Sequence, residues 1–178
     1  EAYVDESKPH IPWSPNPVDH FDVLNIDVSG QLASPLLIAG QYPHDSSKPD
    51  RSPIQASHDG QPRYIIPASS FKGALRHQVA RVIRVLSADP ELEEHIFDGR
   101  VVLEDIVLEE PKTKIYHRVA IHPIKGGYKD GALVEEETVS GRFATGLHFR
   151  FDEQSDRDKA SVALILFALR DFAAGRQS

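Results

Sequence analysis

The order of the predicted elements indicates an α+β fold of the ferredoxin-like or RRM-like type (βαββαβ) with loop insertions. Along the 178 residues, hydrophobic periodicity changes from a strand to a helix, then to several strands and to a last helix. One domain is therefore predicted over residues 21–178, after an extended N-terminal arm over residues 1–20 that contains four prolines. The final strand of this fold is expected to be absent, because the last predicted element is a helix that ends near Gly175.

The first strand is predicted within residues 21–39. Val23, Ile26 and Val28 give this segment strand-like spacing, and a second apolar run continues at residues 36–38 after a Ser-Pro break. Residues 40–62 are polar and rich in proline, so they are predicted to form a loop. Loops of this length without their own secondary structure are more often functional than idle.

A helix is predicted to follow, with Ser69 or Ser70 as its N-cap. Its apolar residues recur at helical spacing and are predicted to face the core; they are Phe71, Leu75, Val79, Val82 and Leu86. The pair Asp89-Pro90 ends this helix or starts a short second helix that runs through Glu94.

The second half of the chain is predicted to hold strands and one helix. Strands are predicted over residues 100–109, 113–123 and 143–153, and residues 125–139 read as a glycine loop that leads into a further strand. The last helix is predicted over residues 155–175, where Ser155 and Asp158 resemble a capping box.

Composition restricts the classes of function. The net charge of −7 and the pI of about 5.7 argue against nonspecific nucleic-acid binding by the chain as a whole, although binding depends on local charge. The absence of cysteine excludes disulfides and thiolate metal sites. No apolar run approaches the roughly 18 residues that a membrane span needs, and the acidic start is unlike a secretory signal. We therefore expect a cytoplasmic protein without a membrane partner.

Four segments, in order, resemble the RAMP superfamily, the RNA-binding subunits of CRISPR effector complexes. The segment 66-IPASSFKGALR-76 resembles the signature IPGSSLKGALR, with Ala68 in place of glycine. The other segments are 34-SPLLIAG-40, 97-FDGRVVLEDIVL-108 and 118-RVAIHPIKGGYKDGALVEEETV-139, where His122-Pro123 replaces an Asp-Arg pair. Each segment alone is a weak signal, but their order along nearly the whole domain is specific.

This resemblance implies a role in an RNA-guided complex. It is strongest to the repeated backbone subunits of type III effectors, which hold the guide RNA and cut the target RNA at regular intervals. A module of a fused RAMP effector fits the same pattern. The implied partners are the CRISPR guide RNA, the target RNA and other RAMP subunits or modules.

The first two turns of the predicted helix are the first candidate RNA-binding site. Lys72 and Arg76 are four residues apart and share a helix face, while Ser69, Ser70 and Gly73 leave room for an RNA backbone. Taken alone, the pattern is typical of a solvated helix face. The resemblance implies that these five residues contact the guide RNA.

The glycine loop is the second candidate RNA-binding site. Lys125, Gly126, Gly127 and Lys129 combine positive charge with a backbone that other groups can approach closely. By itself this is an ordinary turn, and the resemblance implies that it borders the path of the RNA.

The long loop holds the candidate catalytic residues, by resemblance to target-cleaving backbone subunits. Asp50, in 50-DRSPI-54, is the first candidate and Asp45 is the second. The implied role is to orient or deprotonate a ribose 2′-OH for attack on the adjacent phosphate, with Mg²⁺ assisting. A plain aspartate at a turn explains the same residues.

Three alternatives to this nuclease remain open from the sequence. The first is a non-catalytic scaffold module of the same assembly. The second is an enzyme that processes guide RNA without a metal, with His44 or His58 as general acid–base, and the third is a ferredoxin-like domain unrelated to RNA. None of the nine histidines has the spacing of a zinc site, so no structural metal is expected.

Overall fold

The computed structural model describes residues 22–40, 49–121 and 128–175, and it describes no side chains between residues 120 and 132. The predicted arm over residues 1–20 lies outside this part of the chain. The elements, in chain order, are β1 (Asp22–Gln31), β2 (Gln55–His58), β3 (Gln61–Ile66), α1 (Ala68–Leu86), α2 (Glu91–Phe97), β4 (Val101–Leu103), β5 (Ile106–Val107), β6 (Glu109–Ile121), β7 (Tyr128–Phe151) and α3 (Asp156–Ala173). This order confirms the predicted α+β class.

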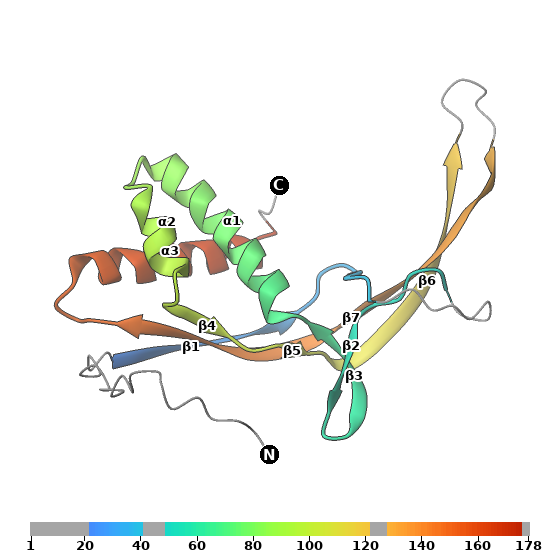
Figure 1. Cartoon of the computed structure of the whole chain (residues 1–178), viewed down its shortest axis with the longest axis horizontal. Coiled ribbons are helices and arrows are strands. Elements are labelled where there is room, and N and C mark those ends of the chain that lie inside the picture. Colours follow the sequence, from blue (N-terminus) through green and yellow to red (C-terminus); the bar gives the residue numbers. More distant parts are fainter. Residues whose placement is uncertain (1–21, 41–48, 122–127, 176–178) are drawn as a thin grey trace, which may run out of the picture.

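The 24-residue strand β7 organises the main sheet. Its C-terminal half lies between β1 and β4, antiparallel to both, with Leu147 opposite both Ile26 and Leu103. Its N-terminal half pairs with β6, where Thr113 lies opposite Val139. The β6–β7 hairpin projects from the body of the molecule, away from the helices (Figure 1).

The three helices cover one face of the sheet (Figure 1). Leu75 and Val79 of α1 pack with Ile165 of α3 and with Leu147 and Phe149 of β7, and all five side chains are fully buried. This cluster is the main core, since burial of such side chains is the dominant stabilising term in folding. The predicted stripe on α1 is confirmed at Leu75, Val79 and Val82 but is wrong at Leu86, which is 57% exposed.

A second, smaller core lies near the start of the hairpin. Ile66, Ile106, Leu108 and Val139 are buried there, and Phe71 packs against them. The cluster joins β3, β5 and β7, so it fixes the N-terminal end of α1 against the sheet.

The predicted loop over residues 40–62 is wrong at its end, where β2 and the start of β3 form an antiparallel hairpin. Its turn is Asp59-Gly60, with φ of 51° and 74°. This dipeptide is the preferred sequence for a tight hairpin turn with two positive φ angles. The Asp-Gly dipeptide was therefore a sequence signal for a hairpin, but the proline content of the segment favoured the prediction of a loop.

Two further predictions needed correction in the second half of the chain. The strand predicted over residues 100–109 is divided into β4 and β5, and residues 128–139 and 143–151 of the two later predicted segments belong to one continuous strand, β7. Gly141 is buried within that strand, where a Cβ atom would lie 2.8 Å from the carbonyl oxygen of Glu109. Glycine at this position thus lets β7 continue past an irregularity in β6.

One of the two predicted helix caps is confirmed. Ser155 precedes α3, and its hydroxyl oxygen accepts a hydrogen bond from the backbone N–H of Asp158 at 3.2 Å. The cap predicted for α1 is wrong, because the helix starts at Ala68 after Pro67, so Ser69 and Ser70 lie in its first turn. Asp105, which lies between β4 and β5, accepts a hydrogen bond from the backbone N–H of Ala68 at 2.7 Å.

Candidate nucleic-acid interface

The first two turns of α1 present small, exposed residues together. Ser69, Ser70 and Gly73 are all exposed, and a Cβ atom added at Gly73 would meet no atom within 4 Å. This part of the helix is therefore open to close approach by an extended ligand.

Lys72 is less available than its sequence position suggests. Its ammonium group donates a hydrogen bond to the carbonyl oxygen of Val101 at 3.2 Å, and the side chain is half-buried. A phosphate would have to replace this hydrogen bond or share the ammonium, which has three donors.

Arg76 is held by two groups of α2. Its Nε donates to Oε1 of Glu93 at 2.7 Å, and its guanidinium lies 6.0 Å from the centroid of the Phe97 ring. The arginine side chain is 55% exposed, so the ion pair is a weak surface pair that phosphate can replace.

Several backbone N–H groups at the start of α1 already have hydrogen-bond partners. The carboxylate of Asp105 accepts from Ala68, and the N–H groups of Ser70 and Phe71 donate to the carbonyl oxygen of Pro67. Because these amides have partners, an anion at this helix end would meet side chains more than free backbone N–H groups.

Asp50 lies elsewhere, at the base of the β6–β7 hairpin. Its Oδ2 accepts a hydrogen bond from the backbone N–H of Glu135 at 2.8 Å. The next residue, Arg51, forms a parallel bridge with Glu136, since its N–H donates to Glu135 O and its carbonyl accepts from the N–H of Glu137. The segment after the long loop is thus bound to the edge of β7, and the exposed Asp50 side chain has a fixed position.

Five of the candidate site residues lie outside the described part of the chain. They are His44, Asp45, Lys125, Gly126 and Gly127. The backbone of Lys129 is part of β7, but the structure does not describe its side chain.

Sequence reasoning missed a buried ion-pair cluster beside Asp50. Glu136 is 6% exposed, and its two oxygens pair with different arginines. Arg51 Nη1 lies 3.1 Å from Oε1, and Arg118 Nε lies 2.5 Å from Oε2. Alternating charged residues on β6 were visible in the sequence. Their pairing was not, because Arg118 of β6 and Arg51 reach Glu136 only through the register of both segments against β7.

Tyr64 lies close to the same strand. Burial, followed by the negative charge of Glu137, raises the pKa of the Tyr64 hydroxyl. The hydroxyl therefore stays protonated at neutral pH and remains a hydrogen-bond donor.

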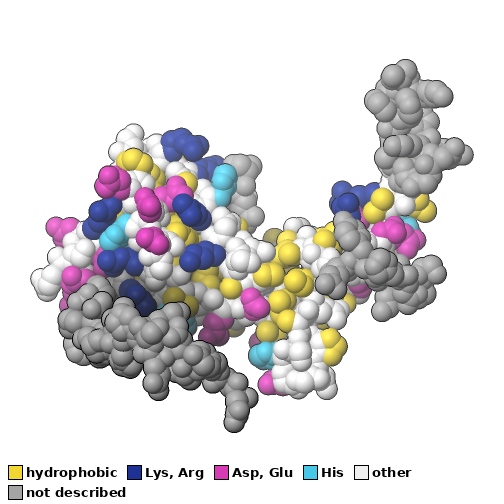
Figure 2. Space-filling model, viewed as in Figure 1, with side chains coloured by type: hydrophobic (Ala, Val, Ile, Leu, Met, Phe, Trp, Pro, Cys, Tyr) yellow, Lys and Arg dark blue, Asp and Glu magenta, His cyan; other side chains and the backbone are white. Residues whose placement is uncertain are grey.

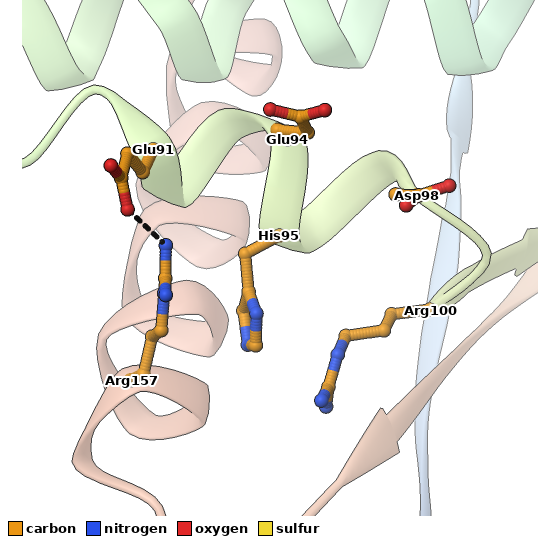
Figure 3. A pocket seen from close by; sticks show the side chains of 6 residues that line it. All are labelled: Glu91, Glu94, His95, Asp98, Arg100 and Arg157. Carbon is orange, nitrogen blue, oxygen red and sulfur yellow. Dashed lines mark hydrogen bonds and ion pairs between the residues drawn. The ribbon is translucent and has the colours of Figure 1, made fainter.

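A separate polar pocket of about 320 Å³ lies between α2, α3 and the start of β4. Figure 3 shows Arg157, His95 and Arg100 side by side in it, with Glu91 paired to Arg157. Beneath them Asp158, which is 1% exposed, accepts from Nη1 of Arg100 at 3.0 Å and lies 2.6 Å from Nε2 of His95. His95, Arg100 and Arg157 in this pocket are therefore each already paired with a carboxylate.

On the face of the helical part that Figure 2 shows, Lys and Arg side chains alternate with Asp and Glu side chains, without one large patch of a single sign. No group of three or more His, Asp or Glu residues in the described ranges could hold a metal ion. No helix within those ranges is long and apolar enough to cross a membrane.

Comparisons with known proteins agree on one family and one fold. A family profile described as the RAMP superfamily matches residues 31–177. A solved chain titled "CRISPR RNA-guided surveillance complex" is similar with a TM-score of 0.52 and 18% identity, over 83% of this chain and 60% of that chain. A second, titled "CRISPR RNA-guided surveillance complex, pre-nicking", has a TM-score of 0.54 and 13% identity, over 83% and 69% of the two chains. No curated protein matches. At these identities the two structures show similarity of fold.

Proposed function

The chain belongs to the RAMP superfamily, and from that premise we propose that it binds CRISPR guide RNA as a backbone subunit of a type III-like effector complex. Target RNA and other RAMP subunits or modules are its proposed partners. The resemblance to surveillance-complex chains in fold supports an assembly of this kind.

The open face at the start of α1 is the observation that carries this proposal. Ser69, Ser70 and Gly73 are exposed beside Arg76, whose only described ion pair is a surface pair with Glu93. Small side chains admit an RNA backbone, and an arginine that can exchange a carboxylate for a phosphate supplies the charge.

Alanine substitution of Lys72 and Arg76, singly and together, tests the proposal. Each cation that neutralises a phosphate of single-stranded RNA contributes about 0.7 to the slope of log K against log salt. The double variant should therefore have a slope shallower by about 1.4, which corresponds to a roughly sevenfold smaller loss of affinity between 50 and 200 mM salt.

Arg84→Ala is the matched control, because Arg84 is an exposed arginine near the other end of α1. It removes the same charge from the same helix, and it should leave the slope close to that of the wild type. If Arg84→Ala and Arg76→Ala change RNA binding equally, the start of α1 is not a specific contact site. Thermal unfolding of the Lys72 variant should accompany the titration, because that variant also loses the hydrogen bond to Val101.

We further propose that Asp50 contributes to cleavage of target RNA. The hydrogen bond from Glu135 gives its carboxylate a defined position, as a general base requires. Asp50 would take the proton of the ribose 2′-OH, the 2′-oxygen would attack the adjacent phosphorus, and the 5′-oxygen of the next nucleotide would leave with a proton from water. The products would be a 2′,3′-cyclic phosphate and a 5′-hydroxyl.

Magnesium remains a proposed cofactor for which the described residues do not provide a complete site. Asp50 is a single carboxylate, and no described group of three His, Asp or Glu residues could hold a metal. Mg²⁺ is usually bound through one or two carboxylates together with substrate phosphates. Among the described residues, Asp50 alone therefore takes part in the proposed cleavage step.

The substitution Asp50→Asn distinguishes a subunit that cleaves target RNA from a non-catalytic scaffold module. Asparagine keeps an oxygen that can accept from Glu135 but loses the charge and the basic group. In a complex reconstituted with guide RNA, the variant should bind target RNA like the wild type and lose cleavage. Unchanged cleavage at the same positions would support the scaffold alternative instead.

A further inference from the structure

We propose that the apolar groove between α1 and α3 receives the N-terminal arm of the same chain, residues 1–20, with the Trp13 side chain against Phe167. The groove lies toward the C-terminal end of α1, away from the candidate RNA-binding residues in the first two turns of that helix. The inference therefore goes beyond the proposed function and does not depend on it.

The groove is lined mainly by apolar side chains that solvent reaches, and it holds about 320 Å³. Val85 and Leu86 of α1 are 76% and 57% exposed, and Phe167 of α3 is 42% exposed. Single apolar residues at a surface are ordinary, whereas several that meet in one concave site mark a place where a partner binds. Leu86, which was predicted to be buried, would be covered by such a partner.

The charged groups of the groove favour an acidic partner. Arg81 and Arg170 line it together with one carboxylate, that of Asp171. Asp171 already accepts a hydrogen bond from Nε2 of Gln78 at 2.9 Å. The guanidinium of Arg170 lies 5.2 Å from the centroid of the Phe167 ring, so it offers positive charge directly beside apolar surface.

The N-terminal arm has the matching chemistry in its sequence. Its formal charge is 1 − 4 = −3, from Lys8 and from Glu1, Asp5, Glu6 and Asp19. Trp13, the only tryptophan of the chain, lies in the segment 10-HIPWSPNP-17. Proline presets an extended backbone, so a proline-rich segment loses little conformational entropy when it binds, and such segments commonly bind in apolar grooves that contain aromatic rings.

The length of the arm allows this placement within one chain. β1 begins opposite Phe151 at the end of β7, and the backbone N–H of the next residue, Asp152, donates to Asp158 in the first turn of α3. The arm therefore joins β1 beside the start of α3. From there to Phe167 the helix rises about 17 Å, whereas the residues between Trp13 and the start of β1 span about 28 Å when extended.

Trp13 can therefore reach the groove of its own chain. An arm that is covalently linked to its own groove has a higher effective concentration there than the arm of a second copy. We therefore assign the groove to the arm of the same chain.

Fluorescence of Trp13 in the full chain tests the proposal, because no other tryptophan contributes to the signal. Compared with a synthetic peptide of residues 1–20, the full chain should show blue-shifted emission and severalfold weaker quenching by acrylamide. Val85→Glu should return both readings to those of the peptide, because the new carboxylate removes apolar contact and repels the acidic arm. Leu86→Ser is a second groove variant that adds no charge, and it should shift both readings in the same direction.

Leu166→Glu is the matched control. Leu166 precedes Phe167 in α3 and is 49% exposed, but it does not line the groove. The substitution adds the same charge at an exposed apolar position, so emission and quenching should stay as in the wild type. Equal effects of Leu166→Glu and Val85→Glu would refute binding of the arm in this groove.

Charge reversal tests the electrostatic contribution. Arg170→Glu should also release Trp13, and Asp5→Lys combined with Glu6→Lys in that variant should restore the emission of the wild type. If Trp13 stays protected in Arg170→Glu, charge complementarity does not select the arm, and this basis of the proposal is contradicted.

Two outcomes overturn the proposal as a whole. If acrylamide quenches Trp13 in the wild-type chain as readily as in the peptide, the arm does not bind the groove. If the emission shifts toward that of the peptide when the chain is diluted, the arm binds a second copy and not its own chain. Neither outcome bears on the RNA titrations of the Lys72 and Arg76 variants, so failure here is distinguishable from failure of the proposed function.

Discussion

Replacement of Asp158 by asparagine should destabilise the domain strongly, although the new side chain has nearly the same size. The carboxylate is 1% exposed and accepts from both Arg100 Nη1, at 3.0 Å, and the backbone N–H of Asp152, at 2.9 Å. Nε2 of His95 lies 2.6 Å from Oδ1. One side chain thus joins α2, α3, the start of β4 and the end of β7.

The free energy of unfolding is expected to fall by about 3 kcal/mol. Removal of one partner from a buried ion pair typically costs about 3–5 kcal/mol, because the other charge remains buried. The side chains of Arg100 and His95 are 26% and 17% exposed, so both recover part of their hydration and the lower end of that range applies. For a chain of this length, 3 kcal/mol corresponds to a decrease in Tm of roughly 6–12 °C.

Urea denaturation monitored by circular dichroism would measure this decrease in the free energy of unfolding. The midpoint should fall with an unchanged m-value, because the surface exposed on unfolding stays the same. Asp156→Asn is the control, since Asp156 lies in the same helix and its side chain is fully solvated beside Lys159. A free energy of unfolding within about 1 kcal/mol of the wild type for Asp158→Asn would refute the view that this carboxylate links the elements.

The same carboxylate should make stability depend on acid pH. Burial alone would raise the pKa of Asp158, but the hydrogen bonds from His95 and from the backbone of Asp152, together with the charge of Arg100, lower it below 3.8. The stabilisation is therefore fully present above pH 3.8 and is lost as the pH falls through the lower folded value. The difference between the wild type and Asp158→Asn should shrink as the pH falls below about 4, and a difference that stays constant at lower pH would contradict this origin.

Three further predictions concern single positions. Gly141→Ala should destabilise the domain by about 1–3 kcal/mol in thermal unfolding, because the new Cβ would lie 2.8 Å from the carbonyl oxygen of Glu109. An unchanged Tm would show that the backbone of β6 shifts at little cost in free energy. Gly73→Ala should stabilise α1 by about 0.5–1 kcal/mol and still weaken RNA binding, so equal RNA affinity would argue against close approach of a backbone there. Glu93→Gln should tighten RNA binding by releasing Arg76, and a weaker complex in the same titration would indicate that the ion pair positions the arginine for RNA.

Much of the fold was predictable from local patterns in the sequence. The helical spacing of Leu75, Val79 and Val82 predicted the buried face of α1, and Ser155 predicted the start of α3. These signals are local, because the period of apolar residues and the needs of a helix end are satisfied within a few residues. The RAMP assignment depended on the order of four motifs, and it is confirmed by the match over residues 31–177.

The candidate sites were predictable only as lists of residues. The sequence placed Lys72 and Arg76 on one helix face, but their contacts with Val101 and Glu93 come from residues 29 and 17 positions away. Asp50 could be selected by resemblance, whereas its hydrogen bond to Glu135 connects segments 85 residues apart.

The sequence by itself thus determined the α+β class, the family, and most of the buried face of α1, because these depend on periodicity and on contiguous motifs. Only the tertiary structure decided that β7 is one strand shared by the sheet and the hairpin, and that Glu136 joins Arg51 to Arg118. The physical reason is that a buried charge can be accommodated only where strand register brings distant partners within hydrogen-bond reach. No local pattern in the sequence specifies that register.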